Sequence, residues 1–314
     1  MNFSANFAQS IPSLLLLIGG FLFIEGSCND NPAELTSEEI VYPVDSNLVL
    51  LTELPKEVDE SSGLLLVSGN LWTQNDSGDG PILYQISSNK AALIHQIKLE
   101  NAFNKDWEEL AQDEHFIYVG DFGNNGGNRR DLTIYKFPKS ALASDSTQDA
   151  ETIHFSYPDQ SRFNYLPYTH NFDCEAMICL GDRLYLFTKN HQDKRTKLYS
   201  LPKAAGAYLA TLEDEFNSDG TITAAAVDKF NEIVALVGYN FDPRTKKFAP
   251  FVWLFYEYPG RDFFKGKTKR FDFPLFGQME GICFFGNDRF FISTESENGK
   301  KGKLFLFDAK KWLD

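Results

Sequence analysis

The sequence lacks the short motifs that identify most enzyme classes. It contains no His-Glu-x-x-His, no Gly-x-Ser-x-Gly, no phosphate-binding loop and no dinucleotide-binding fingerprint. It also has only five histidines and four cysteines in 314 residues, and none of the cysteines forms a CxxC pair. These absences give no support to zinc peptidases, elbow-type serine hydrolases, nucleotide hydrolases or nicotinamide enzymes. We therefore predict no organic cofactor.

Positive charge is also scarce. The chain has 30 basic and 44 acidic residues, for a formal net charge of −14. Nucleic acids and anionic membrane surfaces bind basic faces, so neither is an expected partner. What the chain has in quantity is apolar and aromatic side chains, at 43% and 15% of residues. This composition excludes intrinsic disorder and favours β-strands.

The only long apolar run lies near the N-terminus, at residues 11–24. Fourteen residues are too few to cross a bilayer but suit the apolar region of a signal peptide. We expect residues 1–27 to be a signal peptide, residues 28–46 to be an acidic tether, and residues 47–314 to be the folded domain. The chain is thus predicted to be exported to the periplasm, outer membrane or cell surface, or secreted.

The small residues Gly26 and Ser27 precede Cys28, and this arrangement resembles the lipobox of bacterial lipoproteins. The resemblance predicts that Cys28 is acylated, and that the lipid is the only contact with the membrane. Two features depart from the pattern: Glu25 stands where an aliphatic residue is usual, and residues 1–9 contain no Lys or Arg. Ordinary secretion without a lipid is the alternative.

Three further cysteines lie in hydrophobic, strand-like segments: Cys174, Cys179 and Cys283. A small buried thiol is the expected state of each. A disulfide from Cys283 to one of the other two is the alternative in an oxidising compartment.

An internal repeat determines the predicted fold. A sequence pattern of several short strands recurs five times, with copies beginning at Ser62, Glu108, Glu175, Ala224 and Glu280. Four short strands per copy, repeated every 45–65 residues or so, is the pattern of β-propeller blades. We predict an all-β, single-domain, monomeric propeller of five blades, with six as the alternative. Helices of conventional length are not expected.

The last copy ends after three strands, whereas a spare strand near Leu48 precedes the first copy. The N-terminal strand is therefore predicted to complete the last blade, which leaves no open sheet edge. Fourth strands are expected at residues 92–99, 152–157 and 269–273, and more weakly at residues 208–212. Residues 159–171 are predicted to form an inserted loop.

In a propeller the first strand of each blade lines the central channel. Acidic residues lead these strands or end the second ones, so they should converge on one mouth of the channel. The expected ligand-contacting residues there are Asp76, Asp106, Asp121, Lys189 and Glu295. Crowded carboxylates need a bound cation, shared protons, or intervening Lys and Arg side chains. Oxygen ligands favour Ca²⁺ or Mg²⁺, and several carboxylates together with Asn and backbone oxygens favour Ca²⁺. The candidate calcium ligands are Glu60, Glu108, Glu175 and Glu280.

The alternative for any one of these acids is a structural role, in which a strand-initial carboxylate caps backbone N–H groups. Ala224 stands where the other copies have an acid, which is less expected of a purely structural repeat. Among the histidines, His170 precedes Asp173 and His191 follows Lys189, so both could overlook the mouth. His170 and Asp173 are the candidate catalytic groups, for activating water.

Several segments, in order, resemble a set of secreted bacterial propellers that are similar to the esterase-like phytase and SdiA-regulated groups. The segments are Asp59-Glu-Ser-Ser-Gly-Leu, Leu71-Trp-Thr-Gln-Asn-Asp-Ser-Gly, Asp106-Trp-Glu-Glu-Leu-Ala, Gly120-Asp-Phe-Gly-Asn-Asn, Asp173-Cys-Glu-Ala-Met and Met279-Glu-Gly-Ile. The resemblance covers about residues 48–314 and implies a repeat-built propeller with an acidic, calcium-holding mouth. Two functions fit: a module that binds a glycan, peptide or small molecule, and a metal-dependent hydrolase of phosphate esters or lactones.

Overall fold

The computed structural model describes residues 47–144, 148–228, 230 and 232–313. The predicted signal peptide, the tether and the lipidation site Cys28 lie outside these residues. The described residues belong to one compact unit, Val41–Asp314.

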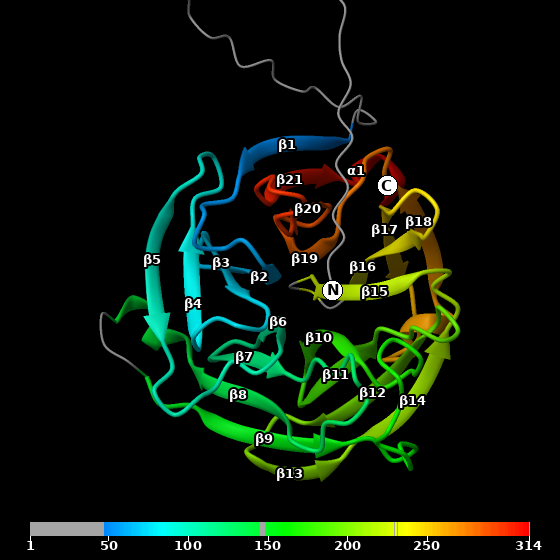
Figure 1. Cartoon of the computed structure of the whole chain (residues 1–314). Coiled ribbons are helices and arrows are strands. Elements are labelled where there is room, and N and C mark those ends of the chain that lie inside the picture. Colours follow the sequence, from blue (N-terminus) through cyan, green and yellow to red (C-terminus); the bar gives the residue numbers. More distant parts are fainter. Residues whose placement is uncertain (1–46, 145–147, 229, 231, 314) are drawn as a thin grey trace, which may run out of the picture. The chain divides into compact units, whose positions relative to one another are not determined.

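The described chain forms a five-bladed β-propeller (Figure 1). The first blade comprises β2 (Ser61–Val67), β3 (Asn70–Asn75), β4 (Ile82–Ile86) and β5 (Leu93–Lys98). The second comprises β6 (Trp107–Gln112), β7 (Phe116–Asp121), β8 (Leu132–Pro138) and β9 (Glu151–Ser156). The third comprises β10 (Cys174–Leu180), β11 (Arg183–Thr188), β12 (Thr196–Pro202) and β14 (Thr211–Phe216). The fourth comprises β15 (Thr221–Val227), β16 (Ile233–Asp242), β17 (Lys247–Tyr256) and β18 (Lys267–Asp272).

The fifth blade closes the ring with strands from both ends of the chain. It contains β19 (Met279–Phe284), β20 (Arg289–Thr294) and β21 (Lys303–Asp308), and its outer strand is β1 (Leu48–Glu53). Strand β1 pairs antiparallel with β21, with Leu48 opposite Phe307 and Glu53 opposite Lys303. The predicted closure by the N-terminal strand is confirmed.

One strand does not follow the four-strand rule. The weak fourth strand expected at residues 208–212 is instead two strands, β13 (Gly206–Leu209) and β14. Strand β14 completes the third blade, whereas β13 adds to the second blade by pairing in parallel with β9. Both strands are largely exposed, so neither shows the alternation of apolar and polar residues that marks a half-buried strand. Residues 159–171 contain no strand, as expected of an inserted loop.

The hydrophobic core consists of five separate layers, each between two neighbouring blades. Residues of the first and second blades form one layer, and the series continues around the ring to the fifth and first blades. Aromatic side chains fill these layers: Trp107, Tyr118 and Phe290 are fully buried. Packing between blades therefore accounts for most of the aromatic content. Cys174, Cys179 and Cys283 are free, buried thiols, as predicted.

Helical structure in the described residues is limited to short segments. These are the 3-10 turns η1 (Lys139–Ala143) and η2 (Phe263–Lys265) and the helix α1 (Lys310–Leu313). Among the described residues there is no helix with the length and apolar character needed to span a membrane.

Candidate functional site: an acidic channel mouth

All five inner strands carry a β-bulge close to the same end of the channel. The register of β6 with β7 shifts between Trp107 and Glu109, and equivalent shifts occur in β2, β10, β15 and β19. A bulge leaves a residue outside the regular pairing and redirects its side chain. The residues skipped in four of the strands are Glu108, Glu175, Thr223 and Glu280. Three acids are thereby brought to equivalent places around the axis.

The bulges change how the copies align. In β15 the residue at the acidic position is Thr223, and Ala224 is the next residue. In the first copy Glu60 lies before β2 and is exposed, so it occupies the place of Asp106 rather than that of Glu108. Of the four candidate calcium ligands, three lie buried at the bulges and Glu60 lies at the outer edge of the mouth.

Three carboxylates converge without a basic partner. Oxygen atoms of Asp76, Asp106 and Glu108 all lie within 4.8 Å of one another. Glu108 is 2% exposed, and its Oε1 atom is buried without a hydrogen-bond partner. Within the part of the chain that the structure describes, no ion pair involves any member of this triad. The triad could therefore hold a metal ion, and its donors are oxygens only.

Electrostatics shows how unfavourable the triad is without a cation. Burial, together with repulsion from Asp76 and Asp173, raises the pKa of Asp106 to about 7. Burial and the surrounding carboxylates raise the pKa of Glu108 well above its ordinary value. Burial also raises the pKa of Asp76. A bound cation would remove the repulsion that causes part of these shifts.

Gly123, in the loop after β7, allows the chain to pass close to two of these carboxylates. A Cβ atom at this position would lie 2.0 Å from Glu108 Oε1 and 2.5 Å from Asp106 Oδ2. The Gly123 N–H also donates to the Asp106 carbonyl oxygen at 3.1 Å. A side chain at Gly123, the second glycine of the Gly-Asp-Phe-Gly segment, would therefore collide with these two carboxylates, which explains why the position is a glycine.

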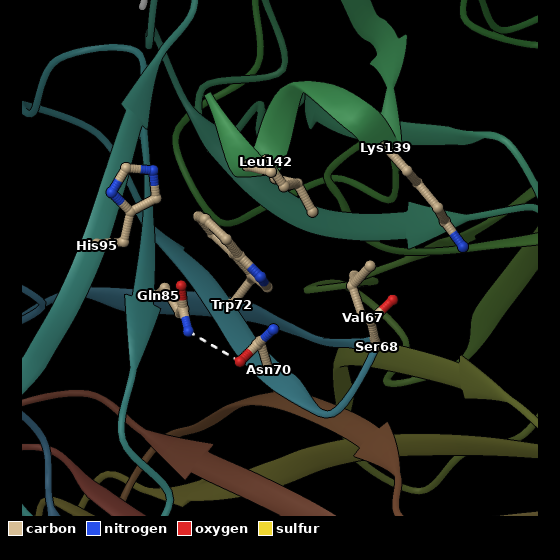
Figure 2. A pocket seen from close by; sticks show the side chains of 9 residues that line it. Val67, Ser68, Asn70, Trp72, Gln85, His95, Lys139 and Leu142 are labelled. Carbon is tan, nitrogen blue, oxygen red and sulfur yellow. Dashed lines mark hydrogen bonds between the residues drawn. The ribbon is translucent and has the colours of Figure 1, made fainter. Parts of the chain in front are cut away.

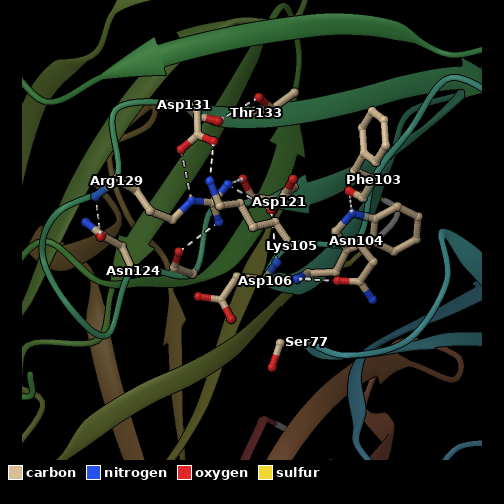
Figure 3. A network of polar contacts seen from close by, with 12 residues as sticks. Ser77, Phe103, Asn104, Lys105, Asp106, Asp121, Asn124, Arg129, Asp131 and Thr133 are labelled. Carbon is tan, nitrogen blue, oxygen red and sulfur yellow. Dashed lines mark hydrogen bonds and ion pairs between the residues drawn. The ribbon is translucent and has the colours of Figure 1, made fainter.

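Two other acids at the mouth, Asp121 and Glu175, have basic partners. Asp121 Oδ1 lies 2.9 Å from Arg129 Nη2, and Figure 3 shows this guanidinium between the carboxylates of Asp121 and Asp131, apart from that of Asp106. Glu175 Oε2 lies 2.9 Å from Lys189 Nζ, and both groups are buried. Of the predicted mouth residues, Asp121 and Lys189 therefore belong to ion pairs.

A pair of acidic residues, Glu280 and Glu295, lies on the fifth blade. Gln278 Nε2 donates to Glu295 Oε2 at 2.7 Å, and Tyr239 OH donates to Gln278 Oε1 at 3.2 Å. Burial raises the pKa of Glu295 to about 9 and that of Glu280 to about 7. The Oε2 atom of Glu280 is buried without a hydrogen-bond partner.

The two histidines near the mouth have different roles. His170 Nδ1 accepts from Phe172 N–H at 3.1 Å, and Nε2 lies 3.0 Å from the Asn125 carbonyl oxygen, so both ring nitrogens bind backbone. His170 thus ties the inserted loop to the loop after β7. His191 Nε2 instead lies 2.8 Å from Asp173 Oδ2, while Asp173 Oδ1 accepts from Asn124 N–H at 2.6 Å. Asp173 orients His191, and of these two histidines only His191 has a ring nitrogen, Nδ1, without a hydrogen bond to the described residues.

Sequence reasoning passed over Glu109, the most central charged residue. Its carboxylate accepts Leu110 N–H at 2.9 Å and Ala225 N–H at 2.7 Å, and it also bonds the N–H groups of Leu64 and Met177. These four donors lie on the inner strands of four blades, so the carboxylate must lie on the channel axis. Burial raises its pKa, and the four N–H groups oppose that shift. Glu109 therefore closes the channel below the acidic mouth.

No known sequence family matches the chain, and no curated protein is detectably similar to it. Solved structures are similar in fold. The PQQ-bound aldose sugar dehydrogenase of Streptomyces coelicolor is 11% identical, with a TM-score of 0.45 over 83% of this chain and 97% of that one. An exo-β-1,3-galactanase of Phanerochaete chrysosporium bound to β-1,3-galactotriose is 10% identical, with a TM-score of 0.50 over 85% of this chain. The matched part is 65% of the galactanase chain. At such identities the similarity shows the propeller fold alone.

Proposed function

We propose that the chain is an exported, lipid-anchored propeller that binds its ligand at the channel mouth through a calcium ion held by Asp76, Asp106 and Glu108. One observation carries the proposal: three carboxylates, that of Glu108 buried and those of Asp76 and Asp106 half-buried, converge with no basic partner, and one buried oxygen has no hydrogen bond. The set contains no nitrogen or sulfur donor, which disfavours zinc. Calcium takes six to eight oxygens, whereas magnesium requires a stricter octahedron of fewer oxygens.

Three carboxylates alone do not complete a calcium coordination shell. The remaining places would be filled by water or by oxygens of the ligand. Hydroxyl, carboxylate and carbonyl groups are suitable, so the expected ligand class is an oxygen-rich glycan, peptide or small molecule. In this function the residues of the mouth bind and orient a ligand, and no chemical step is needed.

Isothermal titration of chelator-treated protein with CaCl₂ and, separately, MgCl₂ tests the metal site. We expect one calcium site in the parent protein and its loss in Glu108→Gln and Asp106→Asn. Glu114→Gln is the matched control, because Glu114 is a neighbouring exposed glutamate whose side chain is 86% accessible. If calcium binds none of these proteins, or binds Glu108→Gln as tightly as the parent, the proposed site is wrong.

A metal-dependent hydrolase of phosphate esters or lactones is the second candidate. The His191–Asp173 pair favours it, since a histidine held by a carboxylate is suited to accept a proton from water. Asp173 also lies close enough to the triad to raise the pKa of Asp106. His191 replaces His170 in this role, because both nitrogens of His170 bind backbone. A panel of phosphomonoesters and lactones, assayed with the parent, Glu108→Gln and His191→Gln, separates the two functions. If the parent binds calcium but hydrolyses none of these substrates, the hydrolase is ruled out for this panel and the binding function is retained.

Export and lipidation are tested in the cell. The proposal predicts that the mature N-terminus is Cys28 carrying acyl chains, detectable by mass spectrometry of the membrane fraction. Cys28→Ser should move the protein to the soluble fraction. A mature chain that begins elsewhere and carries no lipid would leave ordinary secretion as the route.

A further inference from the structure

The opposite end of the channel is a hollow of different character. It has a volume of about 830 Å³ and is lined by the C-terminal halves of all five inner strands. The apolar side chains among its lining residues include Leu64, Leu110, Met177, Ala225, Ile282 and Cys283. Because the Glu109 carboxylate bonds the backbone of the first four of these, it separates this hollow from the acidic mouth. The hollow is large enough for a small organic ligand.

The charged groups at the rim of this hollow leave one cation without a partner. Asp113 accepts bonds from Lys203 and Tyr118 as well as from backbone N–H groups. Asp228 accepts three backbone N–H groups of its own turn. Lys139 Nζ, in contrast, has neither an ion pair nor a hydrogen bond within the described residues, although Lys139 lines the hollow.

Lys139 also lines a second hollow, of about 420 Å³, on the side of the first blade. Figure 2 shows the Lys139 side chain reaching from the segment after β8, with Trp72, His95 and Asn70 across from it. The residues that line this hollow include no aspartate or glutamate, which is unusual in a chain with a net charge of −14. Polar groups are nevertheless present, because Ser68, Asn70 and Gln85 belong to its wall. On this side Lys139 thus suits a negatively charged group, whereas on the side of the larger hollow Asp113 and Glu114 lie near it.

We propose that this end of the channel binds a long-chain carboxylate, with the acyl chain in the apolar hollow and the carboxylate on Lys139. Lys139 belongs to the lining of both hollows, so a carboxylate on its ammonium group can be held while the acyl chain lies against the apolar side chains of the inner strands. Each additional buried methylene should tighten binding about fourfold until the hollow is full. This site does not rest on the proposed calcium site, because Glu109 lies between the two ends of the channel.

Titration with laurate below its micellar concentration, followed by calorimetry, tests the proposal. We expect octanoate, decanoate and laurate to bind with increasing affinity, and dodecanol to bind at least tenfold more weakly than laurate. Lys139→Gln should lower laurate affinity by a similar factor, whereas the exposed Lys90→Gln should not change it. Addition of a chelator should have no effect on laurate binding, which distinguishes this site from the calcium site.

A second variant addresses the acyl chain. Leu66 lines the hollow, and its half-buried side chain also packs against the core layer between the fifth and first blades. Leu66→Asp places a charge beside the ligand and should lower the melting temperature. At a temperature where the variant is folded, it should bind no laurate and should bind calcium as the parent does. The proposal is overturned if the parent binds no laurate, if dodecanol binds equally well, or if Lys139→Gln binds laurate as the parent does.

Discussion

Glu108 and Glu109 are adjacent glutamates, both buried, and replacing each by glutamine should change stability in opposite directions. In Glu109→Gln, one carboxylate oxygen becomes an NH₂ group that faces a backbone N–H, from Leu110 or from Ala225 according to the amide orientation. Each buried group left without a partner costs about 1–3 kcal/mol. Two such groups arise, and the loss is partly offset because the amide carries no buried charge. The expected net loss is about 2–4 kcal/mol.

Glu108→Gln should instead stabilise the metal-free protein. The variant removes a charge that Asp76, Asp106 and Glu175 repel and whose buried Oε1 has no hydrogen bond. Urea unfolding at pH 8 with a chelator present, followed by circular dichroism, measures both changes, with Glu114→Gln as the exposed control. If Glu108→Gln lowers the midpoint, the argument that the triad is repulsive without a cation is refuted. If Glu109→Gln unfolds within about 0.5 kcal/mol of the control, the assignment of Glu109 to the axis is refuted.

Three further predictions concern the mouth. The raised pKa values of Asp106, about 7, and Glu295, about 9, mean that the folded metal-free protein binds more protons than the unfolded chain above about pH 4. Its melting temperature should therefore fall as pH rises from 5 to 9, and saturating calcium should flatten this decline; a melting temperature that rises with pH would contradict the shifts. Arg129→Met should destabilise the protein by about 3–5 kcal/mol in chemical unfolding, since it leaves a buried carboxylate unpaired; a loss below 1 kcal/mol would show that the pair is dispensable. Gly123→Ala should weaken calcium binding at least tenfold in calorimetry, because the added Cβ would occupy the place of Glu108 Oε1. Unchanged affinity would show that Glu108 Oε1 is not a calcium ligand.

The blade count and the ring closure could be predicted because they depend on local patterns. Each copy repeats short apolar strands separated by polar turns, and an incomplete last copy requires an outside strand. Strand β13 could not be predicted, because it pairs with β9, which lies about 50 residues earlier, and its side chains are mostly exposed. Its position depends on a long-range contact that leaves no periodic signal.

The site was predicted in part. Counting along the chain found Glu108, Glu175 and Glu280, since an acid begins the apolar strand in three copies. It placed Glu60 among them because a bulge cannot be recognised from strand periodicity, and one shifted residue changes which side chain faces the axis. Glu109 was missed for the same reason: strict alternation would direct it away from the side on which Glu108 lies. Three-dimensional register, rather than composition, decides which of two adjacent glutamates joins the carboxylate triad and which bonds backbone N–H groups.

The pairing of β1 with β21 also has a consequence for biogenesis. The two strands lie about 250 residues apart in the sequence, so the ring cannot close until β21 has been synthesised. During that interval β1 has no partner strand and β20 has an open edge. A truncation that removes β1 or β21 would leave the fifth blade incomplete, and such fragments should aggregate or be degraded in the cell rather than accumulate as smaller propellers.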